Sequence, residues 1–290
     1  MGTMKAVQIS KRNGPLELVE RNIPEPGRGQ VRIRVEACGV CHGEVVALEG
    51  HHPDMQYPRI PGHEVIGVID QIGDDVHGWS QGERVGVGWN GGHDETTGLT
   101  LDGGYAQYMI AYADGLARIP EGLSAVDAAP LMCAGVTTFG ALKHSSARAG
   151  DLVVIQGIGG LGHLAIQYAR KAGFHTVAVS RGRDKEELAL KLGAHRYIDA
   201  QSEDAAKVLQ EMGERSSSWP QPQTDRRLQT CSTALAPMVK WWSWRVLVMP
   251  CHCPLYNCSM AAVRSADGLR ARQRTRRRPF RLASCQISGR

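Results

Sequence analysis

In the first 120 residues, hydrophobic and polar positions alternate in short segments that proline and glycine interrupt. Alternation with a period of two is typical of strands that bury one face and expose the other. We therefore predict strands over residues 5–10, 31–37, 64–72, 84–87 and 104–111. These short strands, bounded by turn residues, indicate a β-rich first domain.

The pattern changes in the middle of the chain. Residues 125–144 follow a helical period, and from Asp151 the pattern becomes strand, glycine loop, helix, strand, helix, strand. Such alternation is typical of a parallel, doubly wound α/β sheet. The periodicity ends near Met212. We therefore expect three parts: a β-rich domain over 1–150, the first half of a doubly wound domain over 151–212, and an unrelated tail over 213–290.

A glycine-rich loop follows the first strand of the doubly wound part. The apolar run 151–156 leads into Gly157, Gly159, Gly160 and Gly162, and an amphipathic helix over 161–171 comes next. Such glycines let the backbone approach a pyrophosphate, and the helix N-terminus offers free N–H groups and a positive dipole end. The order strand, loop, helix favours dinucleotide binding over a merely structural tight turn.

The end of the next strand, over 175–180, indicates which dinucleotide binds. Where this strand ends, an acidic residue would normally accept hydrogen bonds from the ribose of NAD. Here the turn holds Ser180, Arg181 and Arg183 instead, and Lys185 follows. A hydroxyl and guanidinium groups suit a 2′-phosphate, so we predict NADP(H) in preference to NAD(H). The alternatives are that these arginines are merely solvated, or that Asp184 reaches the ribose.

Two cysteines and one histidine form a candidate metal site. His63 and Glu64 lie in a Gly-His-Glu sequence with glycines at matching intervals, Cys41 precedes them, and Cys133 follows. Catalytic zinc binds a few such ligands and keeps one position for water or substrate. The alternative is a buried structural histidine between unrelated cysteines.

These motifs resemble the zinc-dependent alcohol dehydrogenases of the medium-chain family. The resemblance rests on Gly-His-Glu-x-x-Gly-x5-Gly-x2-Val from Gly62, Cys-Gly-Val-Cys-His over 38–42 and Leu-Met-Cys-Ala-Gly-Val-Thr over 131–137, and it covers residues 4–212. It implies a GroES-like catalytic domain followed by a Rossmann-type domain, here incomplete. It also implies interconversion of an alcohol and an aldehyde or ketone by hydride transfer.

The resemblance also assigns roles to single residues. Cys41, His63 and Cys133 would be the catalytic zinc ligands, with Glu64 an occasional ligand and Glu44 steadying the histidine. His42 would face the pyrophosphate, and Thr137 would approach the nicotinamide.

Two departures from the family pattern concern the site. Gly43 replaces a hydroxyl residue that relays the alcohol proton, and Val46 replaces a relay histidine, while His51 and His52 are expected to be surface loop residues. The four-cysteine cluster of a structural zinc is absent after residue 89, so we expect one zinc ion. The alternative is that a segment near residues 92–94 is skipped in the gene model.

Composition adds a cellular setting. The 290 residues carry a formal net charge of +5, no apolar run is long enough for a membrane helix, and residues 5–10 begin a strand instead of a signal peptide. Cys38, Cys41 and Cys133 are spaced for metal binding in a reducing compartment. We expect a cytoplasmic protein without a membrane partner, acting on a small alcohol or aldehyde. Relatives form homo-oligomers through strands expected beyond Met212.

The tail is the third departure. It is rich in Ser, Trp, Arg and Cys and has no periodicity. If the codons are read one nucleotide earlier, residues 237–244 can encode Asn-Gly-Lys followed by four valines. In the same phase, residues 213–224 can encode Gly-Ala-Lys-Leu-Ile-Leu-Ala-Thr-Ala-Pro-Asn. Each of these is a strand and a turn of the type such domains use. We hypothesise that residues 213–290 are read in the wrong codon phase, which sequencing across the Met212 and Gly213 codons would test. As written, the sheet is expected to stop after about three strands, with little or no turnover.

Two alternative functions follow from the tail. One is an inactive zinc- or nucleotide-binding remnant. The other is a nucleic-acid-associated protein, since the tail holds closely spaced arginines but no recognisable module: Arg270, Arg272, Arg274, Arg276, Arg277, Arg278 and Arg281. A second zinc site at Cys251, His252, Cys253 and Cys258 lacks paired knuckles and is disfavoured.

Overall fold

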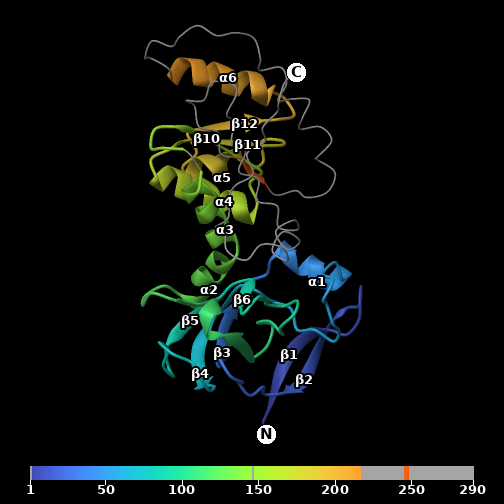
Figure 1. The fold of residues 1–290 in the computed structure, drawn as a ribbon. Helices are drawn as coiled ribbons and strands as arrows, with labels where there is room; N and C mark the ends of the chain where they lie inside the picture. The colour runs from blue at the N-terminus through green and yellow to red at the C-terminus, as the bar shows by residue number, and fades with distance from the viewer. Residues whose placement is uncertain (1, 146, 217–244, 248–290) are drawn as a thin grey trace, which may run out of the picture. The chain divides into compact units, whose positions relative to one another are not determined.

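The computed structural model describes residues 2–145, 147–216 and 245–247. The chain divides into two compact units, Met1–Val136 and Thr137–Arg290 (Figure 1). Each unit has its own hydrophobic core.

The first unit is built on an antiparallel five-stranded sheet with the order β8-β3-β4-β5-β9. Its strands are β3 (Gln30–Cys38), β4 (Val65–Ile72), β5 (Arg84–Val87), β8 (Tyr108–Tyr112) and β9 (Leu116–Arg118). Apolar residues from four of these strands interlock in one buried cluster: Val31, Ile33, Val65, Ile69, Val85, Val87, Met109 and Ala111. The alternation in the sequence therefore corresponds to a real buried face.

Smaller elements complete this unit. Two further antiparallel pairs are β1 (Thr3–Ile9) with β2 (Leu16–Asn22), and β6 (Asn90–Gly92) with β7 (Glu95–Thr96). The short helices are η1 (His42–Glu44), α1 (Val45–Glu49), η2 (Ala113–Gly115), α2 (Ala125–Ala128) and η3 (Ala129–Met132).

Two predicted elements differ from the structure. The strand expected over 104–111 begins only at Tyr108, because the amides of Gly104 and Tyr105 bond to the carbonyls of Gly62 and Pro61 instead of to a strand ladder. The helix expected over 125–144 is interrupted at Cys133, whose backbone (φ −123°, ψ −76°) is not helical. This interruption matters because Cys133 is a candidate ligand.

The second unit is a twisted sheet with helices on both faces. Three parallel strands stand in the order β12-β11-β10, namely β10 (Leu152–Gln156), β11 (His175–Ser180) and β12 (Arg196–Asp199). The helices are α3 (Ala134–Lys143), which crosses the boundary between the units, α4 (Gly160–Lys171), α5 (Glu186–Lys191) and α6 (Ala205–Ser216). Val153 and Ile155 pack with α4, and Val154 packs with α6. This is the predicted doubly wound α/β fold.

The β10 edge of this sheet carries one more strand. β13 (Arg245–Leu247) pairs antiparallel with β10, so the sheet does not stop at its three parallel strands. A strand edge offers unpaired N–H and C=O groups, and pairing satisfies them. The other predictions about the tail, including the arginine run and Cys251–Cys258, lie outside the described residues.

Within the described residues, no single helix is both long and apolar enough to cross a membrane. The segments Ala125–Met132 and Ala134–Lys143 meet the criteria only when taken together, and they are bent by 53°.

Candidate zinc site and nucleotide loop

Strand pairing brings Cys41 and His63 together. The last residue pair between β3 and β4 is Cys38 with Val65, so the chain leaving β3 and the chain entering β4 are neighbours. Cys41 lies three residues beyond that pair and His63 two residues before it. The Gly39 amide donates to the Glu64 carbonyl at 2.9 Å, which extends the contact past the ladder. The sheet register therefore places the two ligands at one end of the sheet.

Cys133 reaches the same place through a close approach of backbones. A side chain at Gly88 would lie 2.5 Å from the carbonyl oxygen of Met132, and one at Gly86 would lie 2.3 Å from its sulfur. Gly86 in β5 and Gly88 just after it thus leave the space that Met132 of η3 fills. The break in the helix at Cys133 follows directly.

The candidate ligand atoms form a tight cluster. Those of Cys41, His63, Glu64 and Cys133 all lie within 4.8 Å of one another. The two sulfurs are 3.9 Å apart, and the Gly43 amide donates to the Cys41 sulfur at 3.4 Å. His63 and Glu64 are buried, with exposed fractions of 8% and 3%. Sequence positions as distant as 41 and 133 therefore converge.

Glu44 holds the histidine from behind. Its Oε1 lies 2.7 Å from Nδ1 of His63, and its Oε2 accepts a hydrogen bond from the Gly62 amide at 3.0 Å. A ring that donates from Nδ1 to a carboxylate has its Nε2 lone pair free for a metal. This is the contact that the family resemblance implies for Glu44.

The electrostatics of the cluster suit a divalent cation. The hydrogen bond with Cys133 lowers the pKa of Cys41, and burial opposes that shift less strongly. The same contact and burial raise the pKa of Cys133, because a second thiolate beside the first is unfavourable. Burial and the Cys41 thiolate raise the pKa of Glu64 to about 7. A cation bound by both sulfurs would relieve this repulsion, so the donor set fits zinc.

Hydrogen bonds also act on the histidine. Burial disfavours its charged form, yet the contacts with Cys41 and Glu44 outweigh burial and raise the pKa of His63 to about 10. Metal binding would therefore displace a proton from His63.

Two glycines leave room around the cluster. A Cβ at Gly39 would lie 2.0 Å from Oε2 of Glu64, so a side chain there would collide with that carboxylate. A Cβ at Gly43 would lie 3.0 Å from Cε1 of His63 and 3.5 Å from the Cys41 sulfur. Position 43 thus faces the ligands but contributes no group to them.

The nucleotide loop has the geometry that its sequence predicts. A Cβ at Gly162 would lie 1.9 Å from the carbonyl oxygen of Gly157, so only glycine lets α4 pack this closely on the loop. Gly159 caps α4 without a side-chain hydrogen bond to the first turn. A Cβ at Gly160 would meet nothing within 4 Å. The N-terminus of α4 can therefore receive a phosphate group.

The residues predicted to select the cofactor follow β11. Ser180 is half-buried, whereas Arg181, Arg183, Asp184 and Lys185 are exposed. Arg183 also pairs with Glu186 at 3.4 Å. These side chains lie close to one another along the chain because the turn between β11 and α5 is short.

Other predicted residues are not among the candidate ligands. His42 is exposed, and Thr137 is half-buried at the start of the second unit. His51 is an exposed loop residue, as predicted, and lies 2.7 Å from Glu49. The prediction for His52 is wrong, because only 7% of it is exposed. Its Nδ1 accepts a hydrogen bond from the Asp54 amide at 3.2 Å, which folds the ring inward.

Cys38 is not part of the cluster, although the sequence grouped it with Cys41 and Cys133. Burial raises the pKa of its thiol to about 12, so it remains protonated at neutral pH. Sequence reasoning also missed Tyr197 and Asp199, which bond to the loop after β11. The acidic end of a predicted strand was the only signal for them.

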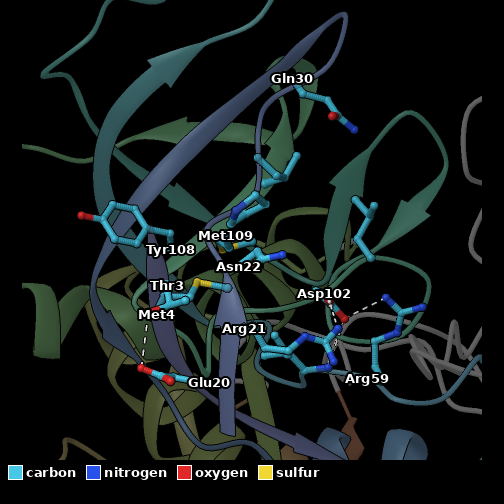
Figure 2. A pocket seen from close by; sticks show the side chains of 14 residues that line it. Thr3, Met4, Glu20, Arg21, Asn22, Gln30, Arg59, Asp102, Tyr108 and Met109 are labelled. Atoms are coloured by element: carbon cyan, nitrogen blue, oxygen red, sulfur yellow. Dashed lines mark hydrogen bonds and ion pairs between the residues drawn. The ribbon is translucent and has the colours of Figure 1, made fainter. Parts of the chain in front are cut away.

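A separate hollow of about 890 Å³ lies on the first unit (Figure 2). In it, Arg21 and Arg59 point toward Asp102, at 3.8 and 3.0 Å. None of the candidate zinc ligands lines this hollow. A smaller hollow of about 400 Å³ also includes Arg59, together with His93 and Asp94.

Comparison with known proteins identifies both parts of the described chain. Residues 27–121 match the alcohol dehydrogenase GroES-like domain, and residues 160–217 match the zinc-binding dehydrogenase family. Alcohol dehydrogenase patD of Aspergillus clavatus is 43% identical over 233 residues, which are 73% of this chain and 58% of that protein. An alcohol dehydrogenase of Geobacillus stearothermophilus is 42% identical over 226 residues, 72% of this chain and 67% of that protein.

Solved structures extend the comparison. The cobalt- and zinc-bound thermostable alcohol dehydrogenase from Pyrobaculum aerophilum has a TM-score of 0.64 and 28% identity, over 72% of this chain and 68% of that one. CAD from Helicobacter pylori, complexed with NADP(H), has a TM-score of 0.59 and 25% identity, over 67% of this chain and 64% of that one.

The chain belongs to the zinc-dependent alcohol dehydrogenases of the medium-chain family, and it has a GroES-like domain followed by a Rossmann-type domain. It spans less than two thirds of the length of its Aspergillus relative.

Proposed function

We propose that this chain is a zinc-dependent oxidoreductase that interconverts a small alcohol and an aldehyde or ketone with NADP(H). The observation that carries the proposal is the cluster of Cys41, His63 and Cys133, with Glu44 fixing the ring of His63. Glu64 is close enough to be an occasional ligand. Two cysteines and one histidine leave one position of a tetrahedral zinc for water or substrate, as a catalytic site requires.

The chain's residues prepare the site for this reaction. Zinc, when bound, would polarise the alcohol oxygen and lower its pKa. Glu44 holds the Nδ1 proton of His63, and Cys41 accepts the Gly43 amide, so two ligands are oriented before substrate arrives. Gly43 has no hydroxyl to accept the alcohol proton. That proton would therefore leave through water.

NADP(H) would bind the second unit and supply or accept the hydride. Gly157, Gly159, Gly160 and Gly162 would approach its pyrophosphate, and His42 and Thr137 would contribute as the family resemblance implies. Ser180, the guanidinium groups of Arg181 and Arg183, and Lys185 would bind the 2′-phosphate, and the NADP(H) complex of the Helicobacter relative supports this choice.

One zinc ion per chain is part of the proposal. No cysteine occurs between Cys41 and Cys133, so a second cysteine cluster cannot form in that segment. A cytoplasmic location and a homo-oligomeric assembly stay predictions from the sequence. The inactive remnant and the nucleic-acid-associated protein are not favoured by the family assignment.

The test combines metal content with turnover. The purified chain should hold about one zinc. It should reduce a small aldehyde with NADPH only slowly, because the residues that would line one side of the nicotinamide are expected beyond Met212. Cys133→Ser should lose both properties, and Cys38→Ser, which changes a thiol outside the cluster, should keep both. Bound zinc without any turnover would overturn the proposal in favour of the remnant, and equal zinc in Cys133→Ser would overturn the ligand set.

A further inference from the structure

Gly182, in the turn after β11, makes two hydrogen bonds to residues of β12. Its amide donates to Oδ1 of Asp199 at 2.7 Å, and its carbonyl accepts a hydrogen bond from the Tyr197 hydroxyl. The Ala200 amide also donates to the Ser180 carbonyl, at 2.9 Å. Three hydrogen bonds therefore join this turn to the end of the neighbouring strand.

These bonds fix the peptide groups next to both arginines. The amide of Gly182 belongs to the peptide that follows Arg181, and its carbonyl belongs to the peptide that precedes Arg183. Gly182 has φ +72°, a conformation that side chains disfavour, so the turn depends on glycine here. Both arginine backbones are thus held, although their side chains are exposed.

The Asp199 carboxylate has two hydrogen-bond partners besides Gly182. Its Oδ1 also accepts the Gln201 amide at 2.9 Å, and its Oδ2 accepts the Ser202 hydroxyl at 2.8 Å. Only 6% of the residue is exposed. Three donors and burial at the strand end therefore hold this carboxylate in place.

We propose that Tyr197 and Asp199 are positioning residues that hold the turn so that Arg181 and Arg183 receive the 2′-phosphate of NADP(H). The inference rests on the proposed preference for NADP(H). Flexible arginines lose conformational entropy when they bind a phosphate, and a fixed backbone reduces that cost. We call the hydrogen bonds from Tyr197 and Asp199 to Gly182 the clamp. Loss of the clamp should therefore weaken recognition of the phosphate and leave the rest of the nucleotide site intact.

The test uses two small probes on the full chain, 2′,5′-ADP and 5′-AMP, with affinities measured by calorimetry. They share the adenosine and differ in the 2′-phosphate. Tyr197→Phe removes one hydroxyl, and we expect the affinity for 2′,5′-ADP to fall about two- to tenfold while that for 5′-AMP changes by less than about twofold. Asp199→Asn should act in the same direction. Tyr168→Phe, which removes a hydroxyl from α4, is the matched control and should change neither affinity.

A second readout needs no nucleotide. Trypsin cleaves after Arg181 and Arg183, the two residues on either side of Gly182. In Tyr197→Phe, cleavage at these two bonds should accelerate by about two- to tenfold, and cleavage after Arg170 and Lys171 should not. Mass spectrometry of the fragments distinguishes local loosening from general unfolding.

The outcomes separate the two proposals. The ratio of the two affinities in the unmodified chain tests NADP(H), and equal affinities would overturn that proposal and the inference with it. With a clear preference for 2′,5′-ADP, unchanged affinities in Tyr197→Phe, or equal losses for both probes, would overturn the inference alone. Faster cleavage at every basic residue would also overturn it, because the hydroxyl would then support the whole unit.

Discussion

The candidate zinc cluster and the nucleotide turn are built in opposite ways. The cluster draws ligands from three distant parts of the first unit, and its His63 and Glu64 are buried. The residues proposed to select the cofactor follow one another between Ser180 and Lys185, and most of them are exposed. Tertiary packing fixes the cluster, whereas the nucleotide turn depends on a few hydrogen bonds. We therefore expect mutations near the cluster to have the larger effects.

The largest effect is expected for Glu44, which contacts a ligand from outside the cluster. Glu44→Gln keeps the size of the side chain but removes the charge that faces Nδ1 of His63 at 2.7 Å. Replacing such a partner typically weakens metal affinity about 10- to 100-fold. Zinc affinity measured by competition with a chromophoric chelator would show this loss.

The matched control is Glu36→Gln, which alters a carboxylate paired with Arg84 in the same unit. It should leave zinc affinity unchanged. Equal weakening in both variants would mean that Glu44 acts through general charge and not through His63.

A smaller effect, on stability, is expected in the second unit. In Gly162→Ala the new methyl group would lie 1.9 Å from the Gly157 carbonyl, so the loop and α4 must separate. Overpacking of this kind costs about 1–3 kcal/mol in the free energy of unfolding. Urea denaturation of the full chain, followed by circular dichroism, would measure it.

Gly160→Ala sharpens this prediction because its methyl group would meet nothing within 4 Å. Stability should be kept or slightly increased, since alanine restricts the unfolded chain more than glycine does. If Gly160→Ala lowered the free energy of unfolding as much as Gly162→Ala, any side chain at the start of α4 would be destabilising. The contact between position 162 and the Gly157 carbonyl would then not be the cause.

The same contrast explains what could be predicted from the sequence. The strand, glycine loop and α4 were predictable because their signals lie within about 20 residues and depend on local turn chemistry. The grouping of the candidate metal ligands was predictable mainly through the family motifs, because nothing local relates Cys41 to Cys133. The break in the helix at Cys133 directly follows the close approach of Met132 to Gly88, a long-range contact that no helical period reports.

Burial of single polar residues was the least predictable feature. His52 and His51 are adjacent in one loop, yet one is buried and the other is exposed. The His52 ring accepts a hydrogen bond from the Asp54 amide, whereas the His51 ring contacts Glu49, so the two side chains take different directions. Asp199 and Tyr197 were missed for a related reason, because their contacts cross from β12 to the turn after β11.

The smallest expected effect is the pH dependence of the clamp. Hydrogen bonds from the Gln201 amide, the Ser202 hydroxyl and the Gly182 amide lower the pKa of Asp199. A carboxyl whose pKa is lower in the folded chain stabilises the fold fully above its unfolded pKa of about 3.9, and this stabilisation is lost as the pH falls through the folded value. Unfolding free energies of the unmodified chain and Asp199→Asn should therefore differ by a constant above about pH 5 and converge in more acidic solution.

Tyr197→Phe provides the control for this titration, because it loosens the turn without removing the Asp199 carboxylate. Its stability should lie below that of the unmodified chain by a similar amount at every pH in the range. If the Asp199→Asn difference also stays constant into acid, the carboxylate charge contributes nothing to the turn, and the hydrogen bonds to Gly182 would hold equally well through a neutral acceptor.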